Sequence, residues 1–351
     1  YRYQNYAVDE IESDGKNLVD TEFMLGMLRD DGIEITNDET EADIIIVNTC
    51  CFINDAKEES VNTILEMAEY KKTGPLKALI VTGCLAQRYK EEIKTEIPEV
   101  DAILGTNSYE DIVKAVHEAL GGTFYENFKT LEGLPSIHTK RSVTTGGHFA
   151  YLKIAEGCNK RCTYCIIPYA RGRVRSRKIA HVMDEVHALA AKGYKEVVLT
   201  GIHLSSYGVD FPAEEKETLL SLIRAVHEVE GIERIRLGSL EPGIITEEFV
   251  QSIAALPKMC PHFHLSLQSG CDTTLERMNR RYRSAEYAEK CGLLRKYLGN
   301  PALTTDVIVG FPGETEEDFQ DTLDVVEKCD FDSAFTFIYS KRTGTPAATM
   351  E

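Results

Sequence analysis

The stretch EGCNKRCTYCIIPYARGRVRSR, Glu156–Arg177, decides how this chain folds and what it can bind. It holds Cys158, Cys162 and Cys165 in the spacing C-x3-C-x2-C, directly after the strand-like run FAYLKIAEG at 149–157. Three thiolates in one short loop can ligate three irons of a [4Fe–4S] cube and leave the fourth iron without a protein ligand. An open position on a redox cluster is a reactive site, so the triplet predicts chemistry rather than structural support.

Two other interpretations of the triplet stay open at this point. A structural zinc ion would need a fourth ligand, and the next sulfur, that of Cys260, lies far downstream. The three thiols could also be unrelated buried side chains, because free cysteine is a common core residue. The position of the triplet at the end of a predicted strand favours the cluster.

Length and composition set the outer bounds. A chain of 351 residues predicts two to three domains, each large enough to bury a core. No stretch approaches about 18 consecutive apolar residues, and the N-terminus shows no secretory signal. Ten cysteines with cluster-like spacing predict a reducing cytoplasm. The net charge of −18 argues against a surface coated with nucleic acid, although a local basic site would be compatible with it.

Residues 1–121 alternate between predicted helices and strands. The runs ADIIIVNTC at 42–50 and KALIVTGC at 77–84 are typical of buried strands, and each ends in a cysteine. Amphipathic helices are predicted over 17–32 and 55–72, and a short strand over 100–106. This pattern predicts a doubly wound parallel α/β domain with sites at the carboxyl ends of its strands. Residues 122–147, rich in Gly, Thr and Ser, are predicted to be a linker.

Residues 148–351 resume the βα rhythm. The six strand candidates are 149–157, 195–203, 234–242, 263–270, 303–313 and 333–340. Six strands with helices between most of them predict a partial (β/α)6 barrel, whose active site would lie at the C-terminal strand ends.

Several separate motifs fall at such strand ends. They are NTC at 48–50, TGCLAQR at 82–88, LTGIHLSSYG at 199–208, RIRLGSLEP at 234–242, LSLQSG at 265–270 and DVIVGFPGET at 306–315. With the cysteine triplet, they make the chain resemble the radical S-adenosylmethionine (SAM) superfamily and, within it, the methylthiotransferases, from about Gly15 onward. Members usually carry one more small β-barrel, the TRAM domain, which we do not find in this sequence.

The resemblance implies the cofactors and their contacts. Cys158, Cys162 and Cys165 would be the catalytic cluster ligands, with SAM bound to the open iron and reductively cleaved to a radical. A one-electron reductant such as flavodoxin or ferredoxin would supply the electron. The residues implied to contact SAM or line its pocket are Tyr164, Thr200, Gly201, Ser239, Glu241, Gln268, Val309, Gly310 and Phe311.

The resemblance also implies an auxiliary [4Fe–4S] cluster in the first domain, ligated by three cysteines. Cys50 and Cys84 match two of the ligands. The third should precede the first helix, but there the sequence reads Ser13-Asp14-Gly15-Lys16-Asn17, without a cysteine and without the apolar strand expected before it. Asp14 or Cys51 could take that place; otherwise the auxiliary cluster would be unstable.

Arginines are frequent in two segments near the predicted barrel mouth, and neither segment contains an acidic residue. Solvated faces are the common explanation for such runs, but Arg clusters also suit phosphate contacts. We therefore expect nucleic-acid contacts from Arg171, Arg173, Arg175, Arg177, Arg280 and Arg281.

The substrate is the least determined feature, because the chain resembles a mosaic of subfamilies. Residues 16–154 look most like enzymes that methylthiolate an aspartate of a small-subunit ribosomal protein. Residues 165–319 look most like tRNA enzymes acting on threonylcarbamoyladenosine, and the final segment like those acting on isopentenyladenosine. We weight the barrel most and expect C2 of a modified adenosine beside the tRNA anticodon as the target of a monomeric enzyme. The ribosomal protein, and a catalytically impaired metal-binding scaffold, are the alternatives.

Overall fold

The chain divides into two compact units. The structure, a computed structural model, describes residues 6–10, 15–135, 141–215 and 217–351. The first unit comprises Tyr1–Thr144 and Ile167–Arg173, and the second comprises Thr145–Ile166 and Val174–Glu351. The seven residues that follow Ile166 therefore belong to the first unit, although the cysteine triplet belongs to the second.

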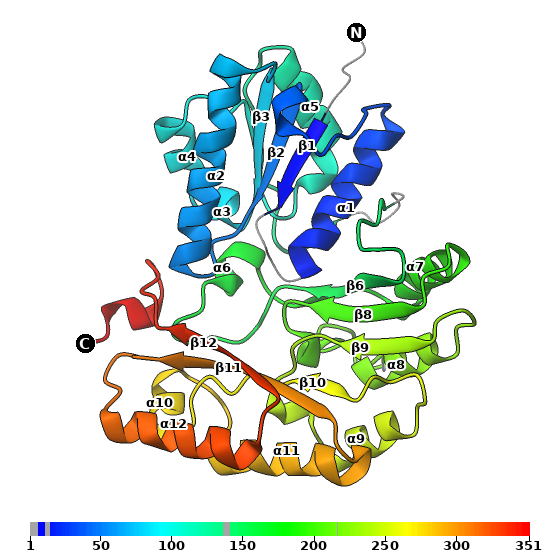
Figure 1. Ribbon diagram of the computed structural model, residues 1–351, viewed down its shortest axis with the longest axis vertical. Coiled ribbons are helices and arrows are strands. Elements are labelled where there is room, and N and C mark those ends of the chain that lie inside the picture. Colours follow the sequence, from blue (N-terminus) through cyan, green and yellow to red (C-terminus); the bar gives the residue numbers. More distant parts are fainter. Residues whose placement is uncertain (1–5, 11–14, 136–140, 216) are drawn as a thin grey trace. The chain divides into compact units, whose positions relative to one another are not determined.

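The first unit is built on a parallel sheet with strand order β1-β2-β3-β4-β5 (Figure 1). Its strands are β1 (Tyr6–Glu10), β2 (Ile44–Thr49), β3 (Ala78–Gly83), β4 (Ala102–Leu104) and β5 (Tyr125–Asn127). Every residue of β2 and β3 is buried, as expected of parallel strands covered on both faces. Thr49 pairs with Gly83, so these two strands end side by side.

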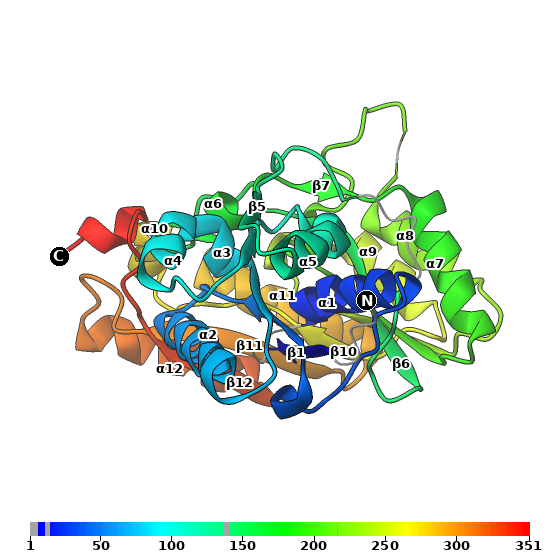
Figure 2. The ribbon, with the colours of Figure 1, turned by 90° about the horizontal axis from the view of Figure 1, so that it is seen from above.

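Helices cover both faces of this sheet. Helices α1 and α5 pack against each other on one face, and α2, α3 and α4 lie on the other (Figures 1 and 2). The helices are α1 (Gly15–Asp30), α2 (Asn54–Thr73), α3 (Cys84–Arg88), α4 (Lys90–Glu96), α5 (Ile112–Leu120) and α6 (Ile167–Arg171). The predicted doubly wound parallel domain is confirmed.

The structure differs from two expectations in this unit. The sequence shows no apolar strand before the first helix, but the structure has one: β1 pairs in parallel with β2. Its sequence, YAVDE, is not a continuous apolar run. The segment predicted as a linker contains β5, which pairs with β4 at the edge of the sheet. Farther along it, the buried Arg141 donates from Nε to Glu22 of α1 at 2.7 Å, so this part of the segment is tied to the unit.

The second unit is an open curved sheet of six parallel strands with one antiparallel addition. The strands are β6 (Phe149–Glu156), β7 (Arg175–Ser176), β8 (Glu196–Gly201), β9 (Arg234–Leu237), β10 (His262–His264), β11 (Ala302–Val309) and β12 (Ser333–Ile338). They form the sheets β7-β6-β8-β9 and β10-β11-β12. Parallel bridges from Ile235 to Met259 and from Leu240 to Leu265 join the β9 side to the β10 side.

Helices lie on the outside of this curved sheet (Figure 1). They are α7 (Ile179–Ala191), α8 (Leu219–His227), α9 (Glu247–Ala254), α10 (Asp272–Arg277), α11 (Ser284–Leu298) and α12 (Glu316–Cys329). The predicted partial (β/α)6 barrel is confirmed, and the C-terminal ends of its strands carry the motifs found in the sequence. None of the helices in the described ranges is long and apolar enough to cross a membrane.

Gly83 is where the first unit tolerates no side chain. Its φ is 96°, and a Cβ there would lie 2.4 Å from the Thr49 carbonyl oxygen. Backbone strain and the clash together predict that Gly83→Ala lowers the free energy of unfolding by ~2–4 kcal/mol. Urea unfolding followed by circular dichroism measures this, with Gly32→Ala as the control. Gly32 also has positive φ (83°) but free space around its Cβ position, so it should cost only ~1 kcal/mol. Equal losses for the two variants would contradict the clash.

Candidate functional site

The cysteine triplet lies in an irregular loop at the C-terminal end of β6. Cys158 and Cys162 are buried and Cys165 is half-buried. The backbone N–H of Lys160 donates to Cys158 Sγ at 3.3 Å, and the Arg280 guanidinium donates from Nη1 to Cys162 Sγ at 3.3 Å. A donor already aimed at a sulfur stabilises it as a thiolate, the form that binds metal. These residues therefore fit a cluster held by three thiolates.

The thiols are also close enough to influence each other. Burial raises the pKa of Cys158 to about 11, and the neighbouring Cys162 and Glu241 add to the increase against the Lys160 N–H, which lowers it. Cluster binding must therefore displace a firmly held proton, so it couples to proton release.

A hydrogen-bonded clasp fixes this loop to the turn after α10. Asn279 Nδ2 donates to the Arg161 carbonyl at 2.7 Å. The Thr163 N–H and hydroxyl donate to the carbonyls of Met278 and Arg277, at 3.1 and 2.8 Å. The clasp holds Arg280, two residues beyond Met278, against the cysteine loop.

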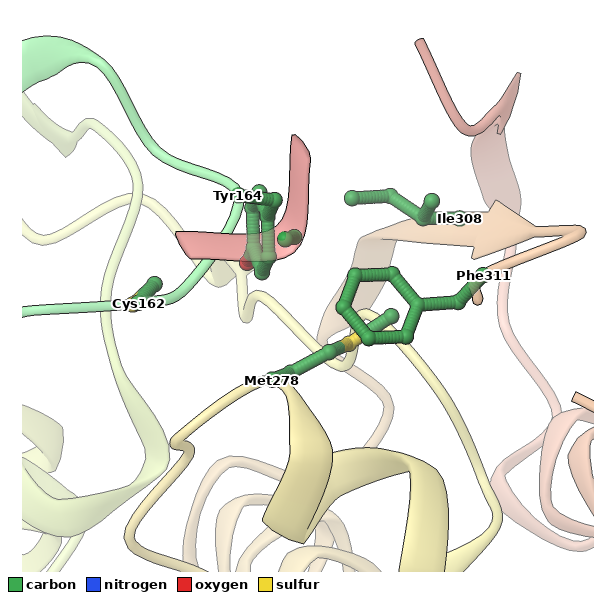
Figure 3. Close-up of a cluster of buried hydrophobic side chains, with 6 residues drawn as sticks. Cys162, Tyr164, Met278, Ile308 and Phe311 are labelled. Atoms are coloured by element: carbon green, nitrogen blue, oxygen red, sulfur yellow. The ribbon is translucent and has the colours of Figure 1, made fainter. Parts of the chain in front are cut away.

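An apolar wall adjoins the triplet. Tyr164, Met278, Ile308 and Phe311 form one buried cluster with Cys162, and Figure 3 shows these four side chains together on one side of Cys162. The Tyr164 and Phe311 rings meet edge to face with centroids 6.1 Å apart. The Tyr164 hydroxyl donates to Gln268 Oε1 at 2.7 Å, so its one polar group is satisfied. Such a wall excludes water from one side of the site.

Glu241 is the carboxylate of the site, and cationic side chains surround it. It accepts from Lys160 Nζ at 2.6 Å and lies 3.5 Å from His203 Nε2 and 3.7 Å from Arg280 Nη2. Burial alone would raise its pKa, but the neighbouring His203, Lys160 and Arg280 outweigh burial and lower the pKa to about 2. Lys160 and His203 were not singled out as site residues from the sequence, although both lie inside motifs quoted above.

The other predicted SAM contacts lie at successive strand ends of the same unit. Thr200 and Gly201 end β8, where a Cβ on Gly201 would come within 3.1 Å of the Ala155 carbonyl. Ser239 is exposed after β9, and Val309 ends β11. Their contacts with SAM remain predictions.

Two backbone positions there have the left-handed conformation. Gln268 has φ 69°, which is rare outside glycine and marks strain of the kind that gathers at functional sites. Gly310 has φ 69° with no atom within 4 Å of its Cβ position, so a ligand could approach its backbone.

A cavity of about 510 Å³ opens beside Glu241. Its lining includes Lys160, His203, Tyr207 and Glu248, together with hydroxyl side chains from the loops after β8 and β9. Because only Glu241 belongs also to the predicted SAM contacts, this space adjoins them rather than coinciding with them.

Cys50 and Cys84 follow the paired ends of β2 and β3 in the first unit. Cys51 is buried beside them: burial raises the pKa of its thiol, and the nearby Cys84 and Cys50 raise it further. The structure therefore gathers three thiols at this sheet edge. Asp14, the other possible third ligand, lies outside the described residues.

Arg171 contacts this second group of cysteines. It donates from Nε to Cys84 Sγ at 3.3 Å and from Nη1 to Asp20 at 2.9 Å, and its Nη2 reaches Asn17. Asn48 Nδ2 in turn donates to the Asn17 carbonyl and the Thr21 hydroxyl, at 3.2 and 2.9 Å. The start of α1 is thus fixed to the strand ends that carry the cysteines.

This burial contradicts most of the predicted nucleic-acid contacts. Arg171, Arg175 and Arg177 are all buried, and the Arg280 side chain is only 9% exposed. Arg177 bonds Glu185 and the carbonyls of Lys153 and His181. Only Arg173 and Arg281 of the six are exposed. The sequence shows that arginines are close together, but not which of their side chains point into the interior and which are exposed.

Among the described residues, a further group of potential metal ligands, Cys271, Asp318 and Asp321, is explained by local structure. Asp318 is the third residue of α12 and forms a capping box with Thr315. It also accepts from Cys271 Sγ at 3.0 Å and from Arg277 at 3.1 Å. Its oxygens are therefore already used in fixing α12.

Comparisons with known proteins agree with this geometry. A model of the Radical SAM superfamily matches residues 152–326, and one of the uncharacterized protein family UPF0004 matches residues 15–105. The ribosomal protein uS12 methylthiotransferase RimO of Lachnoclostridium phytofermentans is 50% identical over 96% of this chain and 76% of its own length. That of Clostridioides difficile is 44% identical over 95% and 74%. The radical SAM methyltransferase TsrM of Kitasatospora setae shares the fold, with a TM-score of 0.67, 15% identity, and coverage of 99% of this chain and 77% of its own.

The chain belongs to the radical SAM methylthiotransferase family. It is a SAM-dependent enzyme whose cofactors are an iron–sulfur cluster and SAM. The expectation of a tRNA substrate is wrong, because relatives that match nearly the whole chain at 42–50% identity are ribosomal protein methylthiotransferases.

Proposed function

We propose that this chain adds a methylthio group to an aspartate of ribosomal protein uS12. The observation that carries the proposal is the 50% identity to a uS12 methylthiotransferase over 336 residues. The burial of four arginines once expected to contact phosphates supports it from the structural side.

Each unit would hold one cluster. In the second unit, Cys158, Cys162 and Cys165 would ligate the cluster that binds SAM, and in the first, Cys50, Cys84 and Cys51 would ligate the auxiliary one. When bound, the first cluster supplies the electron for reductive cleavage of SAM, and the auxiliary cluster supplies or carries sulfur.

The chain's own side chains would bind and orient SAM. The Glu241 carboxylate, ionised across the whole physiological range, can accept a hydrogen bond from the ammonium or a ribose hydroxyl of SAM. The Gly310 backbone is open to the approach of a flat ring. Tyr164 and Phe311 keep one side of the space dry, which protects a reactive species from water.

The charge of the chain suits this substrate. Ribosomal proteins that contact RNA phosphates are basic, and a chain of net charge −18 attracts a basic partner over long range. A ribosomal substrate would place the enzyme in the cytoplasm, where a flavodoxin or ferredoxin could reduce it.

The test is a direct comparison of substrates. The anaerobically reconstituted chain is incubated with SAM, a reductant and either recombinant uS12 or tRNA that carries threonylcarbamoyladenosine or isopentenyladenosine without a methylthio group, and products are analysed by mass spectrometry. We expect a methylthio group on one aspartate of uS12 and none on tRNA. Modification of tRNA alone would contradict the proposal.

The third auxiliary ligand gives a separate prediction. Because Cys51 is buried beside Cys50 and Cys84, Cys51→Ala should remove the auxiliary cluster and about half of the bound iron. Asp14→Ala should leave the iron content unchanged. Iron and sulfide analysis of the two variants decides between the ligands, and the opposite pattern would assign the ligand to Asp14.

A further inference from the structure

Arg280 is a buried cation with an unusual set of partners. Its side chain is 9% exposed and stacks on the Tyr282 ring, with the guanidinium carbon 5.0 Å from the ring centroid. Nε donates to the Tyr282 hydroxyl at 3.0 Å, and Nη1 donates to Cys162 Sγ at 3.3 Å. The Tyr282 hydroxyl is itself fixed by the carbonyls of Ser266 and Leu267. The guanidinium is therefore held against a cysteine sulfur without freedom to turn.

The charges around Arg280 do not balance. Its nearest carboxylate, Glu241, lies 3.7 Å away and is shared with Lys160, which binds it more closely at 2.6 Å. Two cations thus face one carboxylate beside the cysteine loop. The Lys160 side chain is 34% exposed, so water solvates its charge, but the buried Arg280 has only a shared carboxylate. A buried charge without a matching opposite charge is costly, so an additional anion would stabilise Arg280.

The proposed cluster has the charge that is missing. An oxidised [4Fe–4S] core with three thiolates carries one net negative charge, and reduction adds a second. A fixed cation and an N–H donor on a ligand sulfur stabilise the reduced form more than the oxidised form, and so raise the reduction potential.

We infer that Arg280 sets the reduction potential of the SAM-binding cluster by donating a charged hydrogen bond to Cys162. Arg280 is a positioning and tuning residue that acts through the ligand sulfur. It is held in place by the clasp, in which Asn279 donates to the Arg161 carbonyl and the Thr163 N–H donates to the Met278 carbonyl. The inference rests on the proposed assignment of the triplet to that cluster.

The test is a redox titration of the reconstituted chain, followed by electron paramagnetic resonance. The SAM-binding cluster is recognised because its signal changes when SAM is added. Arg280→Gln should lower its reduced-to-oxidised ratio at a fixed potential by about tenfold, a shift of 59 mV to more negative potential for one electron. Arg280→Lys keeps a charge but loses the fixed fork of donors, so we expect about a threefold change.

Arg281→Gln is the matched control, because Arg281 is the neighbouring arginine and is exposed. It should leave the potential unchanged. A wild-type potential in Arg280→Gln at full iron content would overturn the inference. If Arg280→Gln binds no iron, Arg280→Lys decides, and an unchanged potential there would overturn it. Failure of the wild-type chain to bind iron would instead contradict the cluster assignment on which the inference rests.

Discussion

Replacing any one cysteine of the triplet with alanine should reduce SAM cleavage by more than about a thousandfold, to background. Cys158, Cys162 and Cys165 are the only cysteines of that loop, and each would supply one of three protein ligands. Loss of one ligand exposes a second iron and destabilises the cube, so the effect should exceed the 10–100-fold loss typical of outer contacts. Release of 5′-deoxyadenosine from SAM, measured by chromatography after anaerobic reconstitution, is the readout.

Cys260→Ala serves as the control for this series. Cys260 is half-buried before β10, and its N–H bonds the Ile235 carbonyl, an interaction that alanine keeps. This variant should cleave SAM at the wild-type rate. Wild-type cleavage by any triplet variant would remove that cysteine from the ligand set.

Cys84→Ala should separate the two halves of the reaction. We expect methylthiolation to fall by about a hundredfold or more while SAM cleavage stays within about twofold of wild type, because Cys84 belongs to the first unit and the triplet to the second. Mass spectrometry of the substrate and 5′-deoxyadenosine release, measured in the same reaction, give the two rates.

Arg171→Gln tests the surroundings of the same sulfur. It removes the donor to Cys84 but no ligand, so it should lower auxiliary iron retention less than Cys84→Ala does.

Equal loss of methylthiolation and of SAM cleavage in Cys84→Ala would show that the two sites are not separable in this way.

Much of the architecture could be predicted from the sequence. Runs such as Ile44–Val47 are buried on both faces, so their short length and continuous β-branched apolar character favour parallel strands. The strand β1 escaped prediction because Tyr6–Glu10 carries acidic residues, and its place is defined by pairing with β2. Strand pairing depends on both strands, so it cannot be recognised from the amino-acid sequence of one strand alone.

The site was predictable to a lesser degree. Cysteine spacing within one loop is local, so the triplet could be identified directly. The roles of Arg171 and Arg280 depend on contacts across 87 and 118 positions of the chain, and their burial reverses the meaning of the charge run that contains them. The gathering of Cys51 with Cys50 and Cys84 likewise depends on the side-by-side ends of β2 and β3.

The most direct measurement of the central claim is the metal content of the reconstituted wild-type chain, with iron, sulfide and zinc determined together with the electronic spectrum. Two cubes, one on each cysteine set, predict about eight irons and eight sulfides per chain and a broad charge-transfer absorption that fades on reduction. Stoichiometric zinc in place of iron would contradict the account.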